Sequence, residues 1–206
     1  VKNIKSLWRK LNNPMLCRLC EKSRKEINMI DYAVTLEFDK ETENKIQEMI
    51  DEVARVTGCD YMKQSKIPPH VTVSALVSDN EAALLFEMEN IAASMQKGSV
   101  FFANIGIFNP LVIYLGPVMN EFLQDTCRTV NERLLQYASV GNRGRYMPNQ
   151  WVPHTAIAVK LTPETLKEAF SIVQKKFSAF EATAERIVLA RAEPYEELKS
   201  WKLNSK

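Results

Sequence analysis

The sequence predicts an α+β fold with a mainly antiparallel sheet, and three observations support this class. Short runs of alternating or β-branched residues recur along the chain, amphipathic helical segments separate them, and some neighbouring runs lie close enough to form hairpins. Of 206 residues, 46% are hydrophobic and 25% charged, with a formal net charge of +2. This composition fits a globular protein and excludes collagen-like, disordered and disulfide-scaffold chains. The charge gives no general argument for nucleic-acid binding.

The chain begins with a basic segment, residues 1–28, which holds eight Lys or Arg and two Asp or Glu. Four apolar residues in it follow helical spacing: Ile4, Leu7, Trp8 and Leu11. Asn13-Pro14 has the form of an N-cap and first residue of a second short helix. We therefore expect a helical extension that packs on the body, residues 29–206. A basic arm that touches nucleic acid or a membrane surface is the alternative.

The cysteines indicate an ordinary reduced protein. Cys17 and Cys20 form a close pair, but no second pair of ligands for zinc is visible, and the pair precedes the first convincing strand. A redox or metal role remains the alternative to unspecialised thiols. Nothing resembles a secretory signal, so we expect a cytoplasmic protein.

The first part of the body alternates strands and helices. Residues 32–38 alternate apolar and polar side chains and predict a strand, after which Asp39 is placed to cap a helix that ends near residue 56. A loop, 57–69, leads to a second predicted strand, 70–77. Ser78 and Glu81 have the spacing of a capping box, which predicts a helix that reaches about residue 97.

The stretch 98–120 contains no charged residue and is long enough to cross a membrane as a helix. Glycines and prolines interrupt it, and its apolar residues are mostly β-branched or aromatic. Two buried strands, 100–108 and 111–115, joined by an Asn109-Pro110 turn, explain it better, so we expect no membrane association.

The last part repeats the alternation. Asn120 or Glu121 opens a predicted helix that ends near residue 138, and a polar loop, 139–150, follows. Thr162-Pro163 is placed to start a further helix that ends near residue 177. Strands are predicted at four remaining runs: 154–161, 180–184, 187–192 and 197–203.

The only two histidines of the chain, His70 and His154, occupy matching contexts. Pro69-His70-Val71-Thr72 and Pro153-His154-Thr155-Ala156 each precede a strand, a cap and an amphipathic helix, which indicates an internal duplication. Strand alternation puts His70 and Thr72 on one face, and His154 and Ala156 on another. If the halves pack about a pseudo-twofold axis, the histidines converge across a cleft.

Two histidines in one cleft suit phosphodiester cleavage. The reaction needs a base for the nucleophile and an acid for the leaving oxygen, and histidine can serve as either near neutral pH. The hydroxyl of Thr72 could stabilise charge on the phosphoryl group. This chemistry requires no metal and no cofactor, and three histidines for a zinc site are not available.

These motifs resemble those of the two-histidine phosphoesterase superfamily, which includes 2′-5′ RNA ligase-like and cyclic phosphodiesterase proteins. Its signature is two copies of His-x-Thr/Ser about 80 residues apart, and His70 and His154 are 84 residues apart. The resemblance covers about residues 31–203. It implies a bilobal fold in which two lobes with antiparallel sheets face each other over a cleft, and activities that open cyclic phosphates or cleave 2′-5′ linkages.

One departure from the signature concerns the second motif, where Ala156 stands in place of Thr or Ser. Thr155 carries a hydroxyl, but it reaches the substrate only if a bulge redirects it. Further candidates to bind the phosphate are loop residues: Lys66, Arg143, Arg145 and Tyr146. We therefore predict His70, Thr72 and His154 as catalytic, and Thr155, Arg145, Tyr146 and Lys66 as substrate-binding.

The predicted function is a metal-independent phosphodiesterase that acts on a cyclic phosphate or a 2′-5′ linked nucleotide or RNA end. Three alternatives remain: a non-catalytic nucleotide or RNA 3′-end binder, which Ala156 would favour; a reversible 2′-5′ RNA ligase; and an interaction module whose histidines are accidental. We expect a monomer, with RNA as a possible partner.

Overall fold

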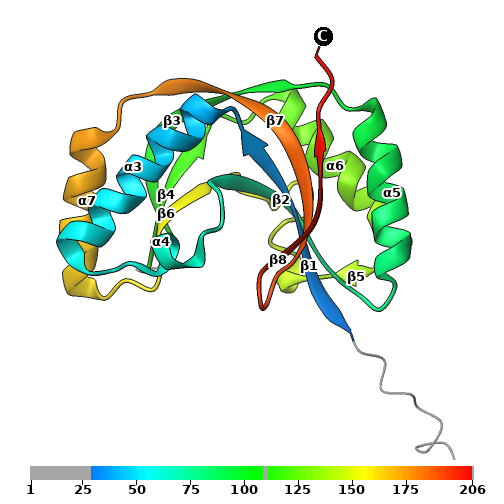
Figure 1. The fold of residues 1–206 in the computed structure, drawn as a ribbon, viewed down its shortest axis with the longest axis horizontal. Coiled ribbons are helices and arrows are strands. Elements are labelled where there is room, and N and C mark those ends of the chain that lie inside the picture. Colours follow the sequence, from blue (N-terminus) through cyan, green and yellow to red (C-terminus); the bar gives the residue numbers. More distant parts are fainter. Residues whose placement is uncertain (1–28, 109–110, 206) are drawn as a thin grey trace, which may run out of the picture.

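The computed structural model of the chain describes residues 29–108 and 111–205 (Figure 1). The first half of this region contains β1 (Ile30–Phe38), α3 (Lys40–Thr57), α4 (Tyr61–Ser65), β2 (His70–Ser78), α5 (Glu81–Ser94) and β3 (Gly98–Phe108). The second half contains β4 (Val112–Pro117), α6 (Glu121–Leu134), β5 (Ser139–Val140), the 3-10 turn η1 (Asn142–Gly144), β6 (Thr155–Ala158), α7 (Pro163–Lys176), β7 (Phe180–Arg191) and β8 (Glu196–Lys202).

The strands form one sheet in the order β5-β2-β1-β7-β3-β4-β6, and β8 pairs with β7 beside this path. Every pair of named strands is antiparallel, which confirms the predicted α+β class. The sheet bends into an arch, with α3 and α7 outside one end and α5 and α6 outside the other (Figure 1). The two lobes thus share a sheet, because the long strand β7 pairs with β1 along most of its length and with β3 at its start.

The strand order confirms the duplication. If β1 corresponds to β4, β2 to β6 and β7 to β3, the order β2-β1-β7-β3-β4-β6 reads the same from both ends. The registers agree residue by residue: Leu36 pairs with Val71 in the first half, and Leu115 pairs with Thr155 in the second. Even the bulges correspond, since one interrupts β1–β2 after Val34 and the other interrupts β4–β6 after Ile113.

The two halves exchange their first helices. α3 follows β1 but packs against α7 and β6, while α6 follows β4 but packs against α5 and β2. Local chemistry starts these helices as predicted: the Asp39 side chain accepts a hydrogen bond from the backbone N–H of Thr42, and the Asn120 side chain accepts one from Leu123. The exchange makes each lobe depend on both halves of the sequence.

The helices cover the convex face of the sheet and leave the concave face for the site. On β2, Val71 and Val73 are fully buried toward the helices, whereas His70 and Thr72 are half-buried on the opposite face. The predicted alternation of this strand is therefore confirmed.

Four sequence-based details were wrong. The stretch 57–69, predicted as a loop, contains the short helix α4. Asn80, not Ser78, caps α5, because the Ser78 hydroxyl donates to the carbonyl oxygen of Tyr137 and accepts from the N–H of Asn80. The two runs predicted after residue 180 are one strand, β7, with a bulge near Glu185. β6 begins at Thr155, so His154 lies just before the strand rather than in it.

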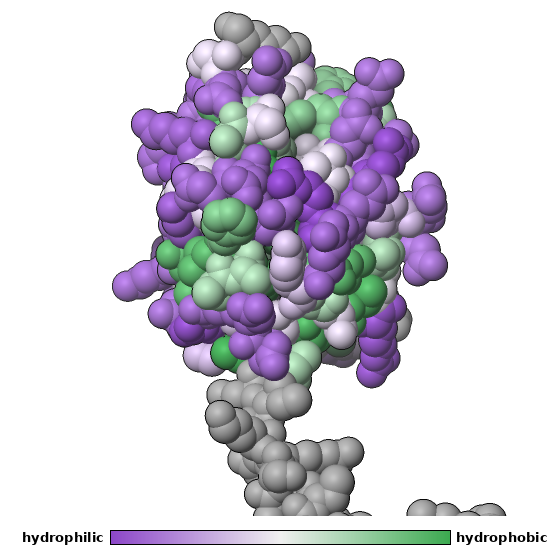
Figure 2. Space-filling model, turned by 90° about the vertical axis from the view of Figure 1, so that its right-hand side faces the viewer, coloured by the Kyte–Doolittle hydropathy of each residue, from purple (hydrophilic) through white to green (hydrophobic). Residues whose placement is uncertain are grey.

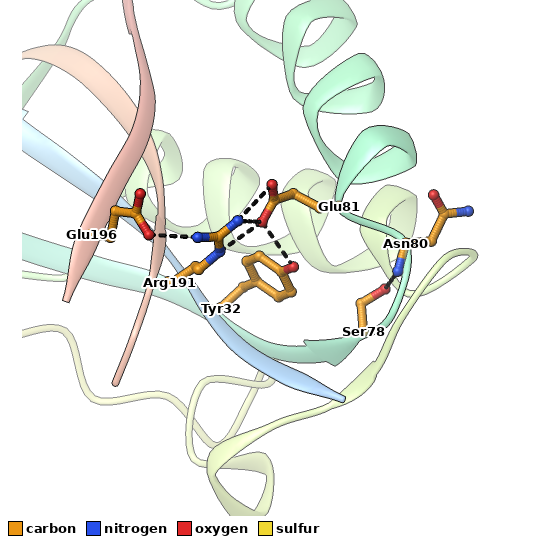
Figure 3. A network of polar contacts seen from close by, with 6 residues as sticks. All are labelled: Tyr32, Ser78, Asn80, Glu81, Arg191 and Glu196. Atoms are coloured by element: carbon orange, nitrogen blue, oxygen red, sulfur yellow. Dashed lines mark hydrogen bonds and ion pairs between the residues drawn. The ribbon is translucent and has the colours of Figure 1, made fainter. Parts of the chain in front are cut away.

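Glu81, which the capping-box prediction assigned to the helix, binds other elements instead. Arg191 of β7 donates two hydrogen bonds to its carboxylate, at 2.8 and 2.9 Å, and the Tyr32 hydroxyl of β1 donates a third at 3.1 Å (Figure 3). Arg191 also contacts Glu196 of β8. The cluster fixes the start of α5 against three strands at one end of the arch.

Seen from the side of α5 and α6, the surface is mainly hydrophilic, with apolar side chains between the charged ones (Figure 2). In the part of the chain that the structure describes, no helix is long and apolar enough to cross a membrane. Strands β3 and β4 occupy the uncharged stretch as predicted, but only β4 is mostly buried, since Val100 and Phe102 are the only buried residues of β3. The predicted extension at 1–28, with Cys17 and Cys20, and the turn at 109–110 lie outside the described residues.

Candidate active site

The two histidines occupy equivalent positions and are held in the same way. His70 is the first residue of β2, and His154 immediately precedes β6. Nδ1 of His70 lies 2.8 Å from the carbonyl oxygen of Pro68, and Nδ1 of His154 lies 2.8 Å from that of Val152. Because a carbonyl oxygen only accepts, each Nδ1 carries the hydrogen. In each neutral ring, Nε2 is therefore the nitrogen free to exchange a proton.

The two motifs touch each other. The Thr155 hydroxyl donates a hydrogen bond of 2.9 Å to the carbonyl oxygen of His70, which joins the start of β6 to the start of β2. Thr155 is only 1% exposed, because strand alternation turns it away from the face of His154. Its hydroxyl is therefore engaged with the backbone and lines neither of the cavities described below. The Thr155 hydroxyl thus faces the backbone of the first motif, and the substrate-binding role predicted for it stays a prediction.

Burial lowers the pKa of both histidines below the ordinary value. For His70 the charge of His154 lowers the pKa further, and the hydrogen bond to Pro68 opposes the shift. For His154 the bond to Val152 opposes the effect of burial. Both rings therefore favour the neutral form in the free protein at pH 7.

Two cavities of about 500 Å³ each open on the concave face. The first, here named the polar well, is lined by residues that include Asp31, Tyr32, Ala33, Thr72, Ala75 and Glu193. The second, the apolar well, is lined by residues that include Phe108, Val112, Arg145, His154, Ala156 and Val159. Asn142 and Tyr146 line both, so the two wells adjoin.

The ring of His154 lies among three aromatic rings. Its centroid is 4.8 Å from that of Phe108 and 5.5 Å from that of Tyr114, both edge-to-face. Tyr146 is nearly parallel to it at 6.2 Å, and Phe108 and Tyr114 stack on each other at 4.1 Å. These contacts hold the imidazole in one orientation.

Tyr146 connects the two motifs. Burial raises the pKa of its phenol, while Arg145 and a hydrogen bond with Thr72 act in the opposite direction. The phenol thus stays protonated at neutral pH and remains a donor. Arg145 beside it is exposed, lines the apolar well and makes no ion pair with any residue that the structure describes. Ala156 is half-buried in the same well.

Two other predicted residues lie apart from the wells. Lys66 is exposed at the end of α4, and Arg143 is exposed in η1. Neither lines a well. Four of the seven predicted site residues therefore line a well: Thr72, Arg145, Tyr146 and His154. His70, Thr155 and Lys66 line neither, although His70 lies two residues before Thr72 on β2 and close enough to His154 for their charges to interact.

The sequence interpretation missed Asn131, which is 1% exposed on α6. Its side-chain amide donates to the carbonyl oxygens of Val73 (3.1 Å) and Tyr146 (3.2 Å), and its oxygen accepts from the Ser74 hydroxyl (2.9 Å). It therefore fixes the loop of Tyr146 against β2 next to Thr72. A signal existed: Asn131 lies four residues after Cys127 on the apolar stripe of α6, where a polar side chain needs buried partners.

In the described region, no three His, Cys, Asp or Glu side chains gather in an arrangement that could hold a metal ion. The thiol of Cys127, close to the loop of Tyr146, is kept unreactive, because burial raises its pKa to about 11.

Comparison with known proteins agrees with this architecture. The chain is similar to TT0787 of Thermus thermophilus (TM-score 0.56, 16% identity, 86% of this chain and all of that one). It is also similar to apo LigT of E. coli (TM-score 0.53, 14% identity, 85% of this chain and 98% of that one). LigT has also been solved with phosphate and with 3′-AMP, at TM-scores of 0.51. No curated protein sequence matches the chain.

At these identities the solved structures establish a common fold. The profile of the 2′-5′ RNA ligase superfamily matches residues 39–196, which contain both histidine motifs and most of the sheet. The chain therefore belongs to the 2′-5′ RNA ligase superfamily, as the paired His motifs had indicated.

Proposed function

We propose that the protein is a phosphodiesterase that opens a nucleoside cyclic phosphate or cleaves a 2′-5′ linkage by general acid and base catalysis. The observation that carries the proposal is the matched pair of imidazoles, His70 and His154, each with Nδ1 bound to a backbone carbonyl and Nε2 free. One ring takes the proton of the attacking hydroxyl or water while the other donates a proton to the leaving oxygen.

Stabilisation of the phosphoryl oxygens falls to Thr72, Tyr146 and Arg145. Thr72 supplies the hydroxyl of the first motif. In the second motif Ala156 supplies none, and the protonated phenol of Tyr146 and the guanidinium of Arg145 border the same well. An Arg fork next to a phenol donor suits a phosphate that carries one negative charge. LigT, a protein of similar fold, has been solved in complexes with phosphate and with 3′-AMP, which supports an anionic nucleotide as ligand.

The test is a panel of 2′,3′-cyclic nucleotides and 2′-5′ linked oligonucleotides, assayed with wild type, His70→Ala and His154→Ala. We expect each substitution to lower kcat by about 10²–10⁴-fold, the usual contribution of one proton transfer. A His154→Ala protein with full activity would contradict the proposal. Circular dichroism should show that both variants fold, because Thr155 bonds to the backbone of His70 and the substitution retains that carbonyl oxygen.

A binding protein without turnover is the second candidate, and Ala156 favours it. It predicts that 3′-AMP or a cyclic nucleotide binds the wild type while no member of the panel is consumed between pH 5 and 8. Any turnover that depends on both histidines rejects this candidate.

A further inference from the structure

We propose that the basic segment, residues 1–28, docks on the outer face of α5 and lays its apolar residues over Phe86. Four of these residues follow helical spacing in the sequence: Ile4, Leu7, Trp8 and Leu11. The docking surface is separate from the candidate active site, because no residue of α5 lines either well. The docking therefore goes beyond the proposed reaction and does not depend on it.

Helix α5 carries apolar side chains toward solvent as well as toward the sheet. Three residues of its inner side are fully buried: Leu84, Met88 and Ile91. On the outer side Phe86 is 69% exposed, more than any other large apolar side chain that the structure describes. The exposed Ala82 and Ala93 lie four residues before it and seven residues after it, a spacing that places all three on one face. A helix that is apolar on both sides normally has a cover on both.

The neighbouring helix α6 has the ordinary polar face of a helix that borders water. Its exposed residues are all polar or charged: Glu121, Gln124, Asp125, Arg128, Thr129 and Glu132. α5 and α6 pack against each other at the same end of the arch, on the side of the molecule that Figure 2 shows. The contrast between the two helices indicates that the missing cover belongs on α5.

The chain enters the body next to α5. Ile30, the first residue of β1, pairs with Ser78, and Asn80, two residues later, is the N-cap of α5 (Figure 1). The 18 residues from 12 to 29 can span about 60 Å when extended. Helix α5, with its 14 residues, is only about 21 Å long. The apolar residues of the segment can therefore reach any turn of α5.

Charge favours the same face. The stretch 79–94 contains four acidic residues and no basic one: Asp79, Glu81, Glu87 and Glu89. The segment 1–28 holds eight basic and two acidic residues, a balance of +6, whereas residues 29–206 hold 19 basic and 23 acidic residues, a balance of −4. An exposed ion pair contributes little stability by itself. Burial of Phe86 therefore supplies most of the stabilisation, and charge selects the face.

A second copy of the chain is a poor alternative cover. A twofold contact between copies places the same surface against itself, so two α5 helices would meet with the acidic stretch 79–94 on both sides. Like charges across an interface oppose association. The basic segment brings the opposite sign to this face, and it is joined to the body beside it.

Trp8 can report the docking in the intact 206-residue chain. The other two tryptophans, Trp151 and Trp201, are only 7% and 8% exposed, so the difference in fluorescence between wild type and Trp8→Phe isolates Trp8. In wild type, Trp8 should emit at a shorter wavelength than N-acetyltryptophanamide and should resist quenching by acrylamide. Phe86→Ser should lower the docking equilibrium constant by about 10- to 150-fold, the contribution of one buried Phe side chain, and should expose Trp8 to the quencher.

Trypsin provides a second readout, because cleavage after Arg9 and Lys10 follows the undocked population. The rate of cleavage at these two residues should rise in Phe86→Ser by the same factor as the docking constant falls. Ala82→Lys, which puts a positive charge one turn from Phe86, should also raise this rate. Val56→Ser changes an exposed apolar residue on α3, a helix of the other lobe, and should leave both readouts as in wild type.

A double variant tests whether the two surfaces touch each other. Leu7→Ser should raise the rate of trypsin cleavage as Phe86→Ser does. The double variant Leu7→Ser/Phe86→Ser should raise it by less than the product of the two single effects, because both substitutions remove the same contact. Effects that multiply fully would contradict a contact between Leu7 and Phe86.

Three further results overturn the docking on α5. The first is quenching of Trp8 in wild type as complete as that of N-acetyltryptophanamide. The second is an unchanged rate of trypsin cleavage in Phe86→Ser and Ala82→Lys, which would place the segment on another surface. The third is a dimer of wild type and a monomer of Phe86→Ser in analytical ultracentrifugation, which would make a second copy the cover. Phe86 and Ala82 are exposed, so circular dichroism should show that their variants fold.

Discussion

Asn131→Leu is expected to damage both stability and catalysis. The substitution removes the partner of the Ser74 hydroxyl and of the carbonyl oxygens of Val73, Tyr146 and Cys127, the last of which lies in the same helix. A buried polar group without a partner costs about 1–3 kcal/mol, and the Tyr146 carbonyl is at the lower end because its oxygen also lies 3.6 Å from the Cys127 thiol. We expect the free energy of unfolding to fall by about 2–4 kcal/mol, measured by urea denaturation.

The duplication provides a variant that separates stability from catalysis. Counted from the helix N-caps, Asn131 corresponds to Ile50, and the strand register relates Ser74 to Ala158. The double variant Ser74→Ala/Asn131→Leu therefore gives this core the chemistry that the opposite lobe already has. Removing both partners should restore about 1 kcal/mol relative to Asn131→Leu.

Catalysis should not recover with stability, because the loop of Tyr146 is still detached from β2. A displacement of about 1 Å in a substrate-positioning group can cost about 100-fold, so kcat/KM for a cyclic nucleotide should stay at least about 10-fold below wild type in the double variant. Ile50→Leu serves as the matched control in the other lobe. If kcat/KM rises in parallel with stability in the double variant, Asn131 serves only the core and the reasoning is refuted.

Three further predictions concern the site. Because burial lowers the pKa of His70 and His154, the histidine that serves as acid loses its proton at a lower pH than an ordinary histidine does. The optimum of kcat/KM should therefore lie below the ordinary histidine pKa of 6.5; an optimum above pH 7.5 would contradict this. Tyr146→Phe should lower kcat by about 10²-fold through loss of a donor, with no change in the free energy of unfolding beyond about 1 kcal/mol; unchanged kcat would remove Tyr146 from the mechanism. Ala156→Thr should not raise kcat/KM. Tyr114 lies opposite Ala156 and fills the space that Thr35, its smaller counterpart in the first half, leaves free opposite Thr72; a tenfold gain would show that the missing hydroxyl limits the rate.

Lowered histidine pKa values also affect stability, and the sign is fixed by the linkage relation. The unfolded chain binds protons at His70 and His154 at a higher pH than the folded chain does, so folding stability from these groups is present above pH 6.5 and is lost as the pH falls below it. Replacing both rings by Gln should flatten this part of the stability profile in urea titrations at pH 5 to 7.

Helix starts could be predicted from the sequence where a side chain bonds to the backbone a few residues ahead. Asp39, Asn120 and Thr162 cap their helices as expected, because an N-cap needs only a short polar side chain and the next few N–H groups. The capping role predicted for Ser78 was wrong because its hydroxyl donates to the carbonyl oxygen of Tyr137, 59 residues away in the sequence. Long-range partners of this kind are not visible in a local pattern.

The candidate site could be located from the sequence to the extent that it repeats. The paired motifs identified His70 and His154, and strand alternation placed Thr72 beside His70. The swap of the first helices between lobes was not predictable, since it depends on which half completes each core. Asn131 lies on a swapped helix, so its contact with β2 and the loop of Tyr146 could be known only from the assembled fold.

The asymmetry of the candidate site fits the proposed acid and base roles of the two histidines. A base and an acid must hold different protonation states at the same moment, and a perfectly duplicated site gives the two imidazoles identical surroundings. In this chain the backbone of the duplication persists, while the side chains beside the rings have diverged. His70 has the hydroxyl of Thr72 two residues ahead, and carboxylates lie along the well that Thr72 lines, whereas His154 has Ala156 and a group of aromatic rings. The small side chain of Ala156 therefore fits the presence of Tyr114 opposite it, because a ring of that size and a branched hydroxyl side chain compete for the same cross-strand space.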